Sequence, residues 1–413
     1  MLPGGIRLGI NSNGKLKTIL VKIYVAADLD ETVTQRVLLP MVLRRGTAHL
    51  TDMQVISRDL EGLYGAGFSN SAAKVGEWHI TKFRLEVVND LFLPSPENLF
   101  EKGLEFLRQV LCDPLEVDGA FHRDYVEQEK VTLQRSIEAL VDDKSAYASF
   151  RCTEEMCRDE PYRLNEQGQV EHLAEIQPQE LFAARRRWFE GAPMAIYIAG
   201  DLDVEKTRAT VERIFRLPRQ STQTLSPLPP RVPVGDPREV RERLSVNQGK
   251  LVLGFRHGVT YTDDRYEAFL LMNGILGGFS HSKLFQNVRE KASLAYYASS
   301  WPERTKRLLF VGCGIGVKNY EKALKIILEQ VEAMKQGDIT DEEIDSTVKT
   351  ILNSNLMLED NFSALADVDY VYSLHGREVD LDAFRRKLKA ISKESIVDVA
   401  RELEHDTTYF LHN

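Results

Sequence analysis

The clearest interruption in the hydrophobic pattern of the chain is a proline-rich stretch near its middle. Six prolines, with Ser, Thr and Gln between them, fall between Arg216 and Val240 and separate two regions of regular apolar periodicity. Proline fixes the backbone φ angle and removes a hydrogen-bond donor, so this stretch is predicted to be an extended linker. We therefore predict an N-terminal domain at residues 1–216, a linker at 217–240 and a C-terminal domain at 241–413.

The two flanking regions show the same order of predicted elements. Each contains an apolar strand, a strand of alternating apolar positions, an amphipathic helix, a long helix ending in acidic residues, and a last helix and strand. The matched segments include Leu16–Ala26 with Lys250–Arg256, Trp78–Val87 with Arg307–Gly314, Pro96–Val110 with Lys318–Met334, and Met194–Ala199 with Thr407–His412. The repetition predicts an α+β fold of two homologous domains, each a mainly antiparallel sheet backed by helices.

Composition excludes several classes of partner. The formal net charge is −9, whereas binding to nucleic acid requires a basic face. No apolar run is long enough to span a membrane, and the first apolar run, Thr18–Ala26, lacks the basic leader of a signal peptide. The four cysteines do not form the two pairs of a zinc site, so structural thiols are expected. We expect a cytoplasmic protein that binds neither nucleic acid nor membrane.

Common catalytic motifs are missing from the chain. No two of the nine histidines lie four residues apart, so no helix presents a histidine pair to a metal ion; Arg401 occupies the position four residues before His405. The sequence has no Gly-x-Ser-x-Gly nucleophile elbow. The glycines at 274–278 lack the Lys and Ser/Thr of a phosphate-binding loop. No catalytic residue is therefore expected to act in this chain on its own.

One segment does combine residues that suit peptide chemistry. A glycine-rich turn with Gly277, Gly278 and Phe279 leads into a predicted helix that carries Arg289, and Tyr296 follows at the start of a strand. A guanidinium and a phenol that converge there could hold a carbonyl oxygen and stabilise a developing oxyanion. The alternative is an arginine and a tyrosine with purely structural roles.

The segment from Leu276 to Tyr297 resembles the C-terminal signature of the pitrilysin and insulinase (inverzincin) zinc peptidases. The resemblance is greatest to the subgroup of mitochondrial processing peptidase and its bacterial relatives, and it covers both halves through the duplicated domains, the proline-rich joint and the Arg-x6-Tyr pair. It implies a half-clamshell fold that closes around a peptide. Active members of the family carry His-x-x-Glu-His on the first long helix, just before a Gly-Thr pair, and a distal Glu on a later helix.

This chain departs from the family pattern at the zinc motif. Counting back from the Gly-Thr pair at residues 46–47 places the two histidine positions on Val37 and Met41, and the position of the general base on Pro40. Valine and methionine are not useful Zn²⁺ ligands, and a proline cannot activate water. The distal glutamate aligns with Ser136, or with Glu138 in a shifted register. The chain is therefore expected to bind no metal.

The accessory glutamate of the family aligns with Glu129, but one carboxylate does not replace two histidines. Arg289 and Tyr296 remain, and in the family this pair contacts substrate from the half opposite the zinc. The resemblance therefore implies the non-catalytic subunit of a heterodimeric zinc metallopeptidase. An active sister subunit would supply the zinc, while this chain closes the substrate chamber with Gly277, Gly278 and Phe279 lining it.

Two alternatives remain open at this stage. The chain could be a homodimeric pseudopeptidase that binds peptides or acts as a scaffold, in which case Arg289 and Tyr296 serve packing. It could also have acquired an unrelated activity in the old cleft, although no cluster of titratable residues indicates one. No peptidase activity is expected of the isolated chain in any of these hypotheses.

Overall fold

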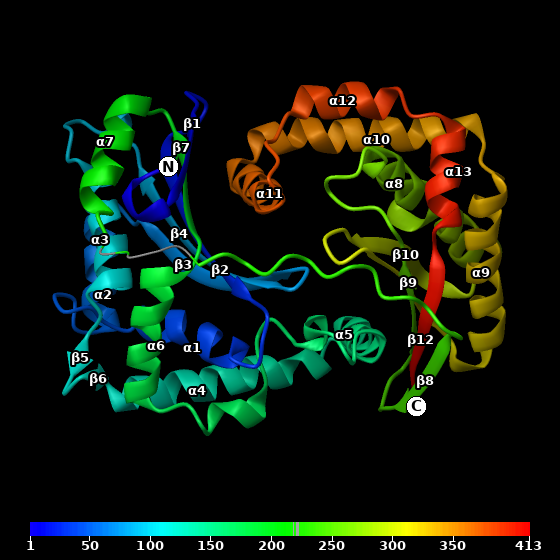
Figure 1. Cartoon of the computed structure of the whole chain (residues 1–413), viewed down its shortest axis with the longest axis horizontal. Helices are drawn as coiled ribbons and strands as arrows, with labels where there is room; N and C mark the ends of the chain where they lie inside the picture. Colours follow the sequence, from blue (N-terminus) through cyan, green and yellow to red (C-terminus); the bar gives the residue numbers. More distant parts are fainter. Residues whose placement is uncertain (218, 220–222) are drawn as a thin grey trace. The chain divides into compact units, whose positions relative to one another are not determined.

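The structure is a computed structural model that describes residues 1–217, 219 and 223–413. The chain divides into two compact units, each built around one five-stranded sheet (Figure 1). The first unit contains Met1–Glu138 and Leu164–Pro227, and the second contains Ala139–Arg163 and Leu228–Asn413. The second unit therefore includes a segment that belongs to the N-terminal half of the sequence.

The two units divide after Pro227, within the stretch that the sequence predicts to be a linker. Residues 223–237 form neither helix nor strand, and a strand begins at Arg238. Positions 218 and 220–222 of the predicted linker lie outside the described residues. The domain boundaries drawn from the sequence stay a prediction.

The sheet of the first unit has the strand order β1-β7-β2-β4-β3. Strands β1 and β7 pair in parallel, and the other neighbours pair antiparallel. Alternate residues of β2, including Ile19, Val21 and Ile23, enter the hydrophobic core, as the two-residue period of a strand requires. The strands are β1 (Arg7–Ser12), β2 (Thr18–Asp28), β3 (Gly67–Val75), β4 (Trp78–Val88) and β7 (Met194–Gly200), with a separate hairpin of β5 (Glu116–Val117) and β6 (Ala120–Phe121).

Six helices accompany this sheet, and several begin at residues that cap a helix well. The carboxylate of Asp52 accepts hydrogen bonds from the amides of Gln54 and Val55 at the start of α2. Pro178 occupies the first turn of α6, where no amide hydrogen is needed. The helices are α1 (Val33–Leu43), α2 (Met53–Gly62), α3 (Leu99–Cys112), α4 (Arg123–Glu138), α6 (Pro178–Gly191) and α7 (Val204–Ile214), with short 3-10 turns η1 (Pro3–Gly5), η2 (Asp90–Phe92) and η5 (Val170–Leu173).

The sheet of the second unit has the order β10-β11-β9-β12-β8, which repeats the topology of the first. Its first and last strands, β8 and β12, again pair in parallel at one edge, and an antiparallel hairpin again forms the other edge. The predicted α+β class with mainly antiparallel sheets is confirmed. The strands are β8 (Arg238–Arg243), β9 (Gly249–Arg256), β10 (Ala295–Glu303), β11 (Leu308–Ile315) and β12 (Glu404–His412).

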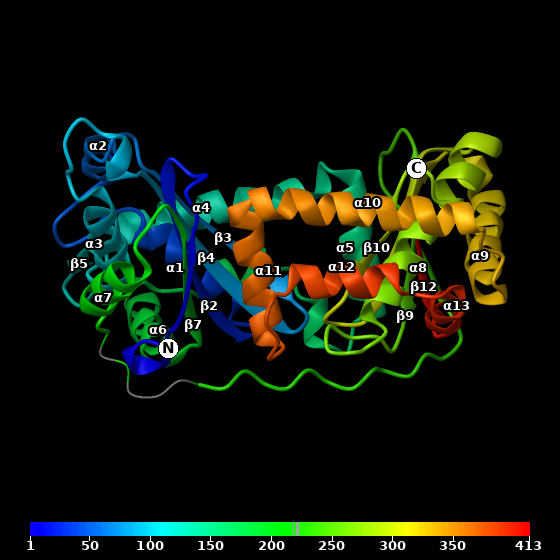
Figure 2. The same ribbon diagram turned by 90° about the horizontal axis from the view of Figure 1, so that it is seen from above.

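Within the described residues, the longest α-helix is α10 of the second unit, with 20 residues. In both views α10 and α12 run side by side, and α9 packs against α13 (Figures 1 and 2). The helix α10 begins with a capping box between Thr340 and Glu343. The helices are α5 (Lys144–Met156), α8 (Tyr266–Asn273), α9 (Tyr320–Gln336), α10 (Asp341–Asp360), α11 (Phe362–Leu374), α12 (Leu381–Lys389) and α13 (Lys393–Arg401), with 3-10 turns η3 (Ala139–Val141), η4 (Pro161–Arg163) and η8 (Val317–Asn319) and π-helices η6 (Gly274–Gly278) and η7 (Phe285–Lys291).

Both faces of the second sheet are apolar. In β9, Leu253 and Phe255 pack into the cluster that includes residues of α8, α9 and α13. Val252, which points the other way, packs with Cys152 and Met156 of α5. An apolar sheet face must be covered, so the helix α5 from the N-terminal half of the sequence completes this unit.

A buried group of charges fixes the chain just after α5. The guanidinium of Arg256, at the end of β9, contacts the carboxylates of Glu160 and Asp406 at 2.7 Å each. The ammonium of Lys306 lies 2.6 Å from the second oxygen of Glu160. The side chains of Arg256 and Lys306 are only 3% and 5% exposed. The two cations lower the pKa of Glu160 against the effect of its burial, which raises that pKa.

A second polar cluster joins the body of α5 to the sheet. The carboxylate of Glu242 in β8 accepts hydrogen bonds from the hydroxyls of Tyr147, at 2.6 Å, and Tyr409, at 2.8 Å. The guanidinium of Arg151 donates to the same carboxylate at 3.0 Å. Tyr147 and Arg151 of α5 therefore both donate to the Glu242 carboxylate, which joins α5 to the sheet.

Two further features concern helix hydrophobicity and the cysteines. Within the described ranges, no helix is both long and apolar enough to cross a membrane. The four cysteines are free, and three of them are buried. Burial raises the pKa of the Cys313 thiol to about 12, which makes that thiol unreactive at neutral pH.

Replacement of Glu160 by Gln is expected to lower the free energy of unfolding by about 3–5 kcal/mol, because Arg256 and Lys306 then lose the buried carboxylate that they share. Guanidinium-induced unfolding measures the change. As a control, Glu329→Gln removes the partner of Lys325 in an exposed pair on α9 and should cost less than about 1 kcal/mol. An effect of Glu160→Gln as small as that of the control would contradict the role assigned to the buried charges.

His257 makes the stability of the second unit depend on pH. Its side chain is fully buried against Phe269, and burial lowers its pKa from 6.5 to about 3. Below pH 6.5 the unfolded chain therefore takes up a proton that the folded chain does not. The free energy of unfolding is expected to fall by up to ~1.4 kcal/mol per pH unit from this residue as the pH drops from about 6.5 towards about 3.

The variant His257→Asn tests this prediction, because its side-chain oxygen can still accept the amide hydrogen of Val259, as the Nδ1 atom of His257 does at 3.2 Å. Urea unfolding between pH 7 and pH 4.5 should show a shallower loss of stability for the variant, whatever its stability at neutral pH. Equal slopes for the two chains would show that His257 is not a source of the acid sensitivity.

Candidate functional site

The helix α1 carries the positions at which active relatives would hold zinc. Val37 and Pro40 are buried and Met41 is partly buried. Val37 lies in the hydrophobic core of the first unit, and Met41 packs against it. Pro40 has no amide hydrogen, so the carbonyl of Arg36 receives no helical hydrogen bond from it. None of the three side chains offers a nitrogen, an oxygen or a thiolate to a metal ion.

The one carboxylate that remains near this helix already has a partner. Glu129 in α4 is 8% exposed, and its Oε1 atom lies 3.3 Å from the Nη1 atom of Arg45. The Arg45 guanidinium also lies over the ring of Tyr125, with its Cζ atom 5.1 Å from the ring centroid. Burial raises the pKa of Glu129, and Arg45 acts against that rise. The positive charge beside the Glu129 carboxylate is thus the guanidinium of Arg45.

The two positions proposed for the distal glutamate also offer no site. Ser136 and Glu138 are exposed on α4, and the carboxylate of Glu138 accepts a hydrogen bond from Gln134 at 2.8 Å. Across residues 1–217, 219 and 223–413, no three His, Cys, Asp or Glu side chains gather closely enough to hold a metal ion. The donor set of a zinc peptidase does not fit the residues present.

The glycine-rich turn of the second unit is a π-helix packed against a strand. A Cβ atom on Gly277 would lie 2.6 Å from the backbone nitrogen of Ser300 in β10 and 2.6 Å from the side chain of Leu284. Glycine is therefore needed there for close approach of the backbone to the strand. Gly278 is exposed, and the Phe279 ring stacks on His281 with the centroids 5.5 Å apart.

Arg289 lies on the second π-helix, η7, and its side chain is 43% exposed. Its Cζ atom lies 4.5 Å above the ring centroid of Phe285, one turn earlier. Its Nε atom lies 3.5 Å from a carboxylate oxygen of Glu290. The aromatic ring supports the guanidinium from one side without using its hydrogen-bond donors, so these donors stay accessible to a ligand.

Tyr296 lies at an irregularity in β10. The register between β10 and β11 shifts between Ala295 and Ala298, so two tyrosines face a single residue of the partner strand. Such a β-bulge redirects side chains. Tyr296 is 76% exposed, whereas the hydroxyl of its neighbour Tyr297 contacts the hydroxyl of Ser145 in α5 at 3.2 Å.

The connection between Arg289 and Tyr296 is short and constrained. Ser293 has a φ angle of +51°, in the left-handed region that is uncommon for residues other than glycine. The amide of Leu294 donates to the carbonyl of Val288 at 3.1 Å, which ties the end of the π-helix to the start of the strand. Both η6 and η7 pack against β10. The structure thus brings the five predicted site residues onto three adjacent elements of one unit.

Sequence reasoning missed some of the residues that support these side chains. Arg45 was overlooked, although it directly precedes the Gly-Thr pair, where a basic residue is visible in the sequence. Phe285 lies in the segment from Leu276 to Tyr297. Its spacing of four residues from Arg289 is that of a pair on one helical face. No sequence pattern predicted the β-bulge at Tyr296.

The chain is similar to known proteins along almost its whole length. Residues 175–351 match the family model described as Peptidase M16 inactive domain. The chain is 37% identical over 409 residues to the probable inactive metalloprotease YmfF of Bacillus subtilis, and the match covers 99% of this chain and 96% of that protein.

Solved structures show the same fold along the whole chain. A conserved protein from Enterococcus faecalis superimposes with a TM-score of 0.92 at 27% identity, and the match covers 100% of this chain and 98% of that one. A peptidase M16 inactive domain from Pseudomonas fluorescens gives a TM-score of 0.80 at 18% identity, covering 100% of this chain and 97% of that one.

The chain is expected to retain no stoichiometric zinc after exposure to the ion and dialysis, because Val37, Pro40 and Met41 provide no ligand. Inductively coupled plasma mass spectrometry measures the bound metal. The variant Glu129→Gln serves as a control and should give the same low zinc content, since Arg45 already pairs with this carboxylate. One zinc per chain, lost in the variant, would overturn the assignment.

Proposed function

The chain belongs to the M16 peptidase family, and we propose that it is the non-catalytic subunit of a heterodimeric zinc metallopeptidase. Within the family we place it in the subgroup of mitochondrial processing peptidase and its bacterial relatives. In this proposal an active sister subunit holds the zinc and the general base, and this chain closes the chamber in which the peptide is cut.

One contrast within the chain carries the proposal. The zinc-motif positions have become part of the hydrophobic core, as the burial of Val37 and Pro40 shows. Arg289 and Tyr296, in contrast, are both exposed, with polar groups that face solvent. A chain that had lost every role in peptide chemistry would have no use for an exposed tyrosine at a bulge.

The position of Tyr296 also suits an extended peptide. Strand β10 lies at the edge of its sheet, so its outer backbone groups are available for pairing. A peptide added as a strand at such an edge places its carbonyl groups beside the side chains of the strand. In the proposal, Arg289 and Tyr296 donate hydrogen bonds to the scissile carbonyl oxygen as negative charge develops on it.

The proposal also assigns a role to the glycine-rich turn and a cellular compartment to the pair of subunits. In the proposal, Gly277, Gly278 and Phe279 line the chamber next to β10. We place the pair of subunits in the cytoplasm, because a reducing compartment keeps the four cysteines in their free form.

A reconstitution experiment tests the function. The active sister is purified alone and together with this chain, and cleavage of a fluorogenic peptide is followed. We expect little activity of either subunit alone and robust activity of the mixture. Arg289→Ala should lower kcat/KM of the mixture about a hundredfold, and Tyr296→Phe should also lower it strongly, because each variant removes a donor to the oxyanion.

The control is Lys291→Ala, which removes a positive charge from the same π-helix at a residue that contacts Asn287. It should leave kcat/KM within about threefold of the unaltered mixture, and analytical ultracentrifugation verifies that each variant still forms the heterodimer. Full activity of the sister alone would exclude the split-site function. Stable self-association of this chain, with no effect of Arg289→Ala, would favour the alternative of a homodimeric peptide-binding scaffold.

A further inference from the structure

A cavity of about 450 Å³ lies within the second unit, among α8, α10, α11 and α12. Its volume is in the range of sites that enclose small molecules. Most of its wall is apolar and comes from four helices and the segment before α12. The apolar lining residues include Leu270, Ile351, Leu358, Val371, Val379 and Phe384.

One end of the cavity presents an arginine held by tyrosines. Arg304 follows directly after β10, and its Nη1 atom donates to the hydroxyl of Tyr266 at 3.1 Å. Its Cζ atom lies 6.0 Å from the ring centroids of both Tyr261 and Tyr266. Within the described part of the chain, no carboxylate forms an ion pair with Arg304. A guanidinium in an apolar cavity without such a partner is a ready site for a ligand carboxylate.

The same cavity contains a buried carboxylate. Glu267 lies in the first turn of α8, lines the cavity and is 3% exposed. Among the described residues it has no hydrogen-bond or ion-pair partner, so it is not paired with Arg304 either. Two opposite charges that face one cavity but do not neutralise each other are costly unless a ligand completes them.

The other charged residues on the lining either form hydrogen bonds or are exposed to solvent. Arg377 donates to the backbone carbonyl of Tyr261. Asp380 caps α12 through a hydrogen bond from a backbone amide at 2.7 Å. Glu378 and Lys387 are exposed. Asp367 of α11 also lines the cavity; it is half-buried and is not free. Arg304 and Glu267 are therefore the two opposite charges that the lining offers to a ligand.

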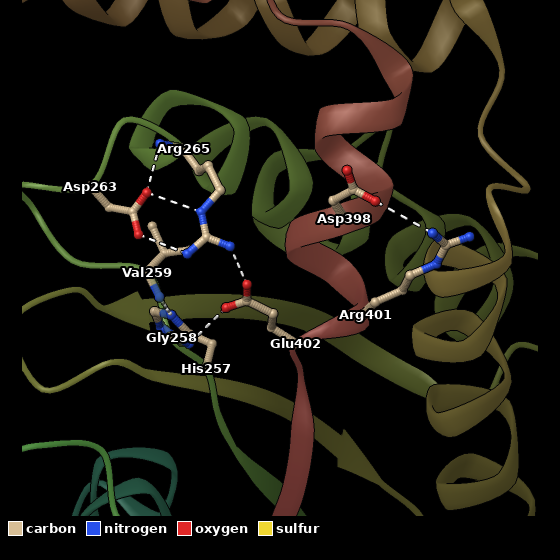
Figure 3. A network of polar contacts seen from close by, with 8 residues as sticks. All are labelled: His257, Gly258, Val259, Asp263, Arg265, Asp398, Arg401 and Glu402. Carbon is tan, nitrogen blue, oxygen red and sulfur yellow. Dashed lines mark hydrogen bonds and ion pairs between the residues drawn. The ribbon is translucent and has the colours of Figure 1, made fainter.

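Polar contacts hold the loop that leads into α8 (Figure 3). Arg265 contacts Asp263 at 2.8 Å and also pairs with Glu402 at the end of α13. The carboxylate of Glu402 accepts the amide hydrogen of Gly258 at 3.2 Å. The ring of Tyr261 packs on Tyr266 with the centroids 5.0 Å apart. The wall beside Arg304 is thus organised before any ligand arrives, which lowers the entropic cost of binding.

We propose that this cavity binds a small zwitterion with an apolar side chain, a free amino acid or a dipeptide. Arg304 receives the α-carboxylate, Glu267 receives the α-ammonium group, and the aliphatic and aromatic wall receives the side chain. The site belongs to the second unit, whereas the zinc-motif positions belong to α1 and α4 of the first, and it involves neither Arg289 nor Tyr296. The inference therefore does not depend on the proposed peptidase subunit function.

Isothermal titration calorimetry of the unaltered chain tests the ligand chemistry. L-leucine and L-phenylalanine are expected to bind saturably, with one site per chain. N-acetyl-L-leucine lacks the ammonium group and L-leucinamide lacks the carboxylate, so each should bind about tenfold to a hundredfold more weakly. Glycine should bind weakly because it has no apolar side chain. Tighter binding of Leu-Leu than of L-leucine would identify dipeptides as the natural source, and the reverse order would identify free amino acids.

Two variants assign the ends of the ligand. Glu267→Gln should abolish the preference for L-leucine over its N-acetyl form, and Arg304→Gln should abolish the preference over leucinamide. Arg386→Gln, at an exposed residue of α12, should leave both preferences unchanged. No saturable binding of any zwitterion, or equal affinity of the unaltered chain for L-leucine and both analogues, would overturn the proposal. The analogue comparison on the unaltered chain decides this even if a variant fails to fold.

Discussion

The fold of the second unit depends on the need to cover a sheet that is apolar on both faces. Leu253 and Phe255 of β9 point to one face and Val252 to the other, so helices on a single side would leave a hydrophobic surface in water. The cover on the second face is α5, which comes from the other half of the sequence. Buried charges then hold it in register, because Glu160 can satisfy Arg256 and Lys306 only when α5 is docked. Apolar burial supplies the driving force, and the ion pairs select one arrangement.

This constraint extends to the candidate site. Ser145 lies in the first turn of α5, and its hydroxyl meets Tyr297, one of the two residues in the bulge of β10. Since Tyr297 is directed inward to α5, the adjacent Tyr296 is left on the exposed side of the strand. On the other side of the bulge, Gly277 allows η6 to approach the backbone of Ser300 closely. The direction of an exposed tyrosine is therefore set by buried contacts that the tyrosine itself does not make.

The sequence predicted those parts of the molecule that local patterns determine. Alternating and continuous apolar runs located β2, β4, β9 and β11. The docking of α5 was not predictable, because its amphipathic pattern shows that it needs an apolar face but not which sheet provides one. The π-helical form of η7 was also missed, since it differs from an α-helix only in hydrogen-bond register. The pairing of Arg45 with Glu129 joins residues far apart in sequence, and no local rule relates them.

The residues that align with the family's zinc motif and the residues that align with its substrate-binding pair differ in burial in this chain. The positions that the resemblance aligns with zinc ligands contribute to stability, because Val37 packs in the core and Arg45 pairs with the buried carboxylate of Glu129. Replacing ligands by apolar side chains there removes the cost of buried polar groups that no metal would satisfy. Tyr296 contributes little to stability, since three quarters of its surface stays in water. A large exposed aromatic side chain held at a bulge is better explained by contact with a partner or a peptide than by folding, and the proposed role in peptide cleavage rests on this difference.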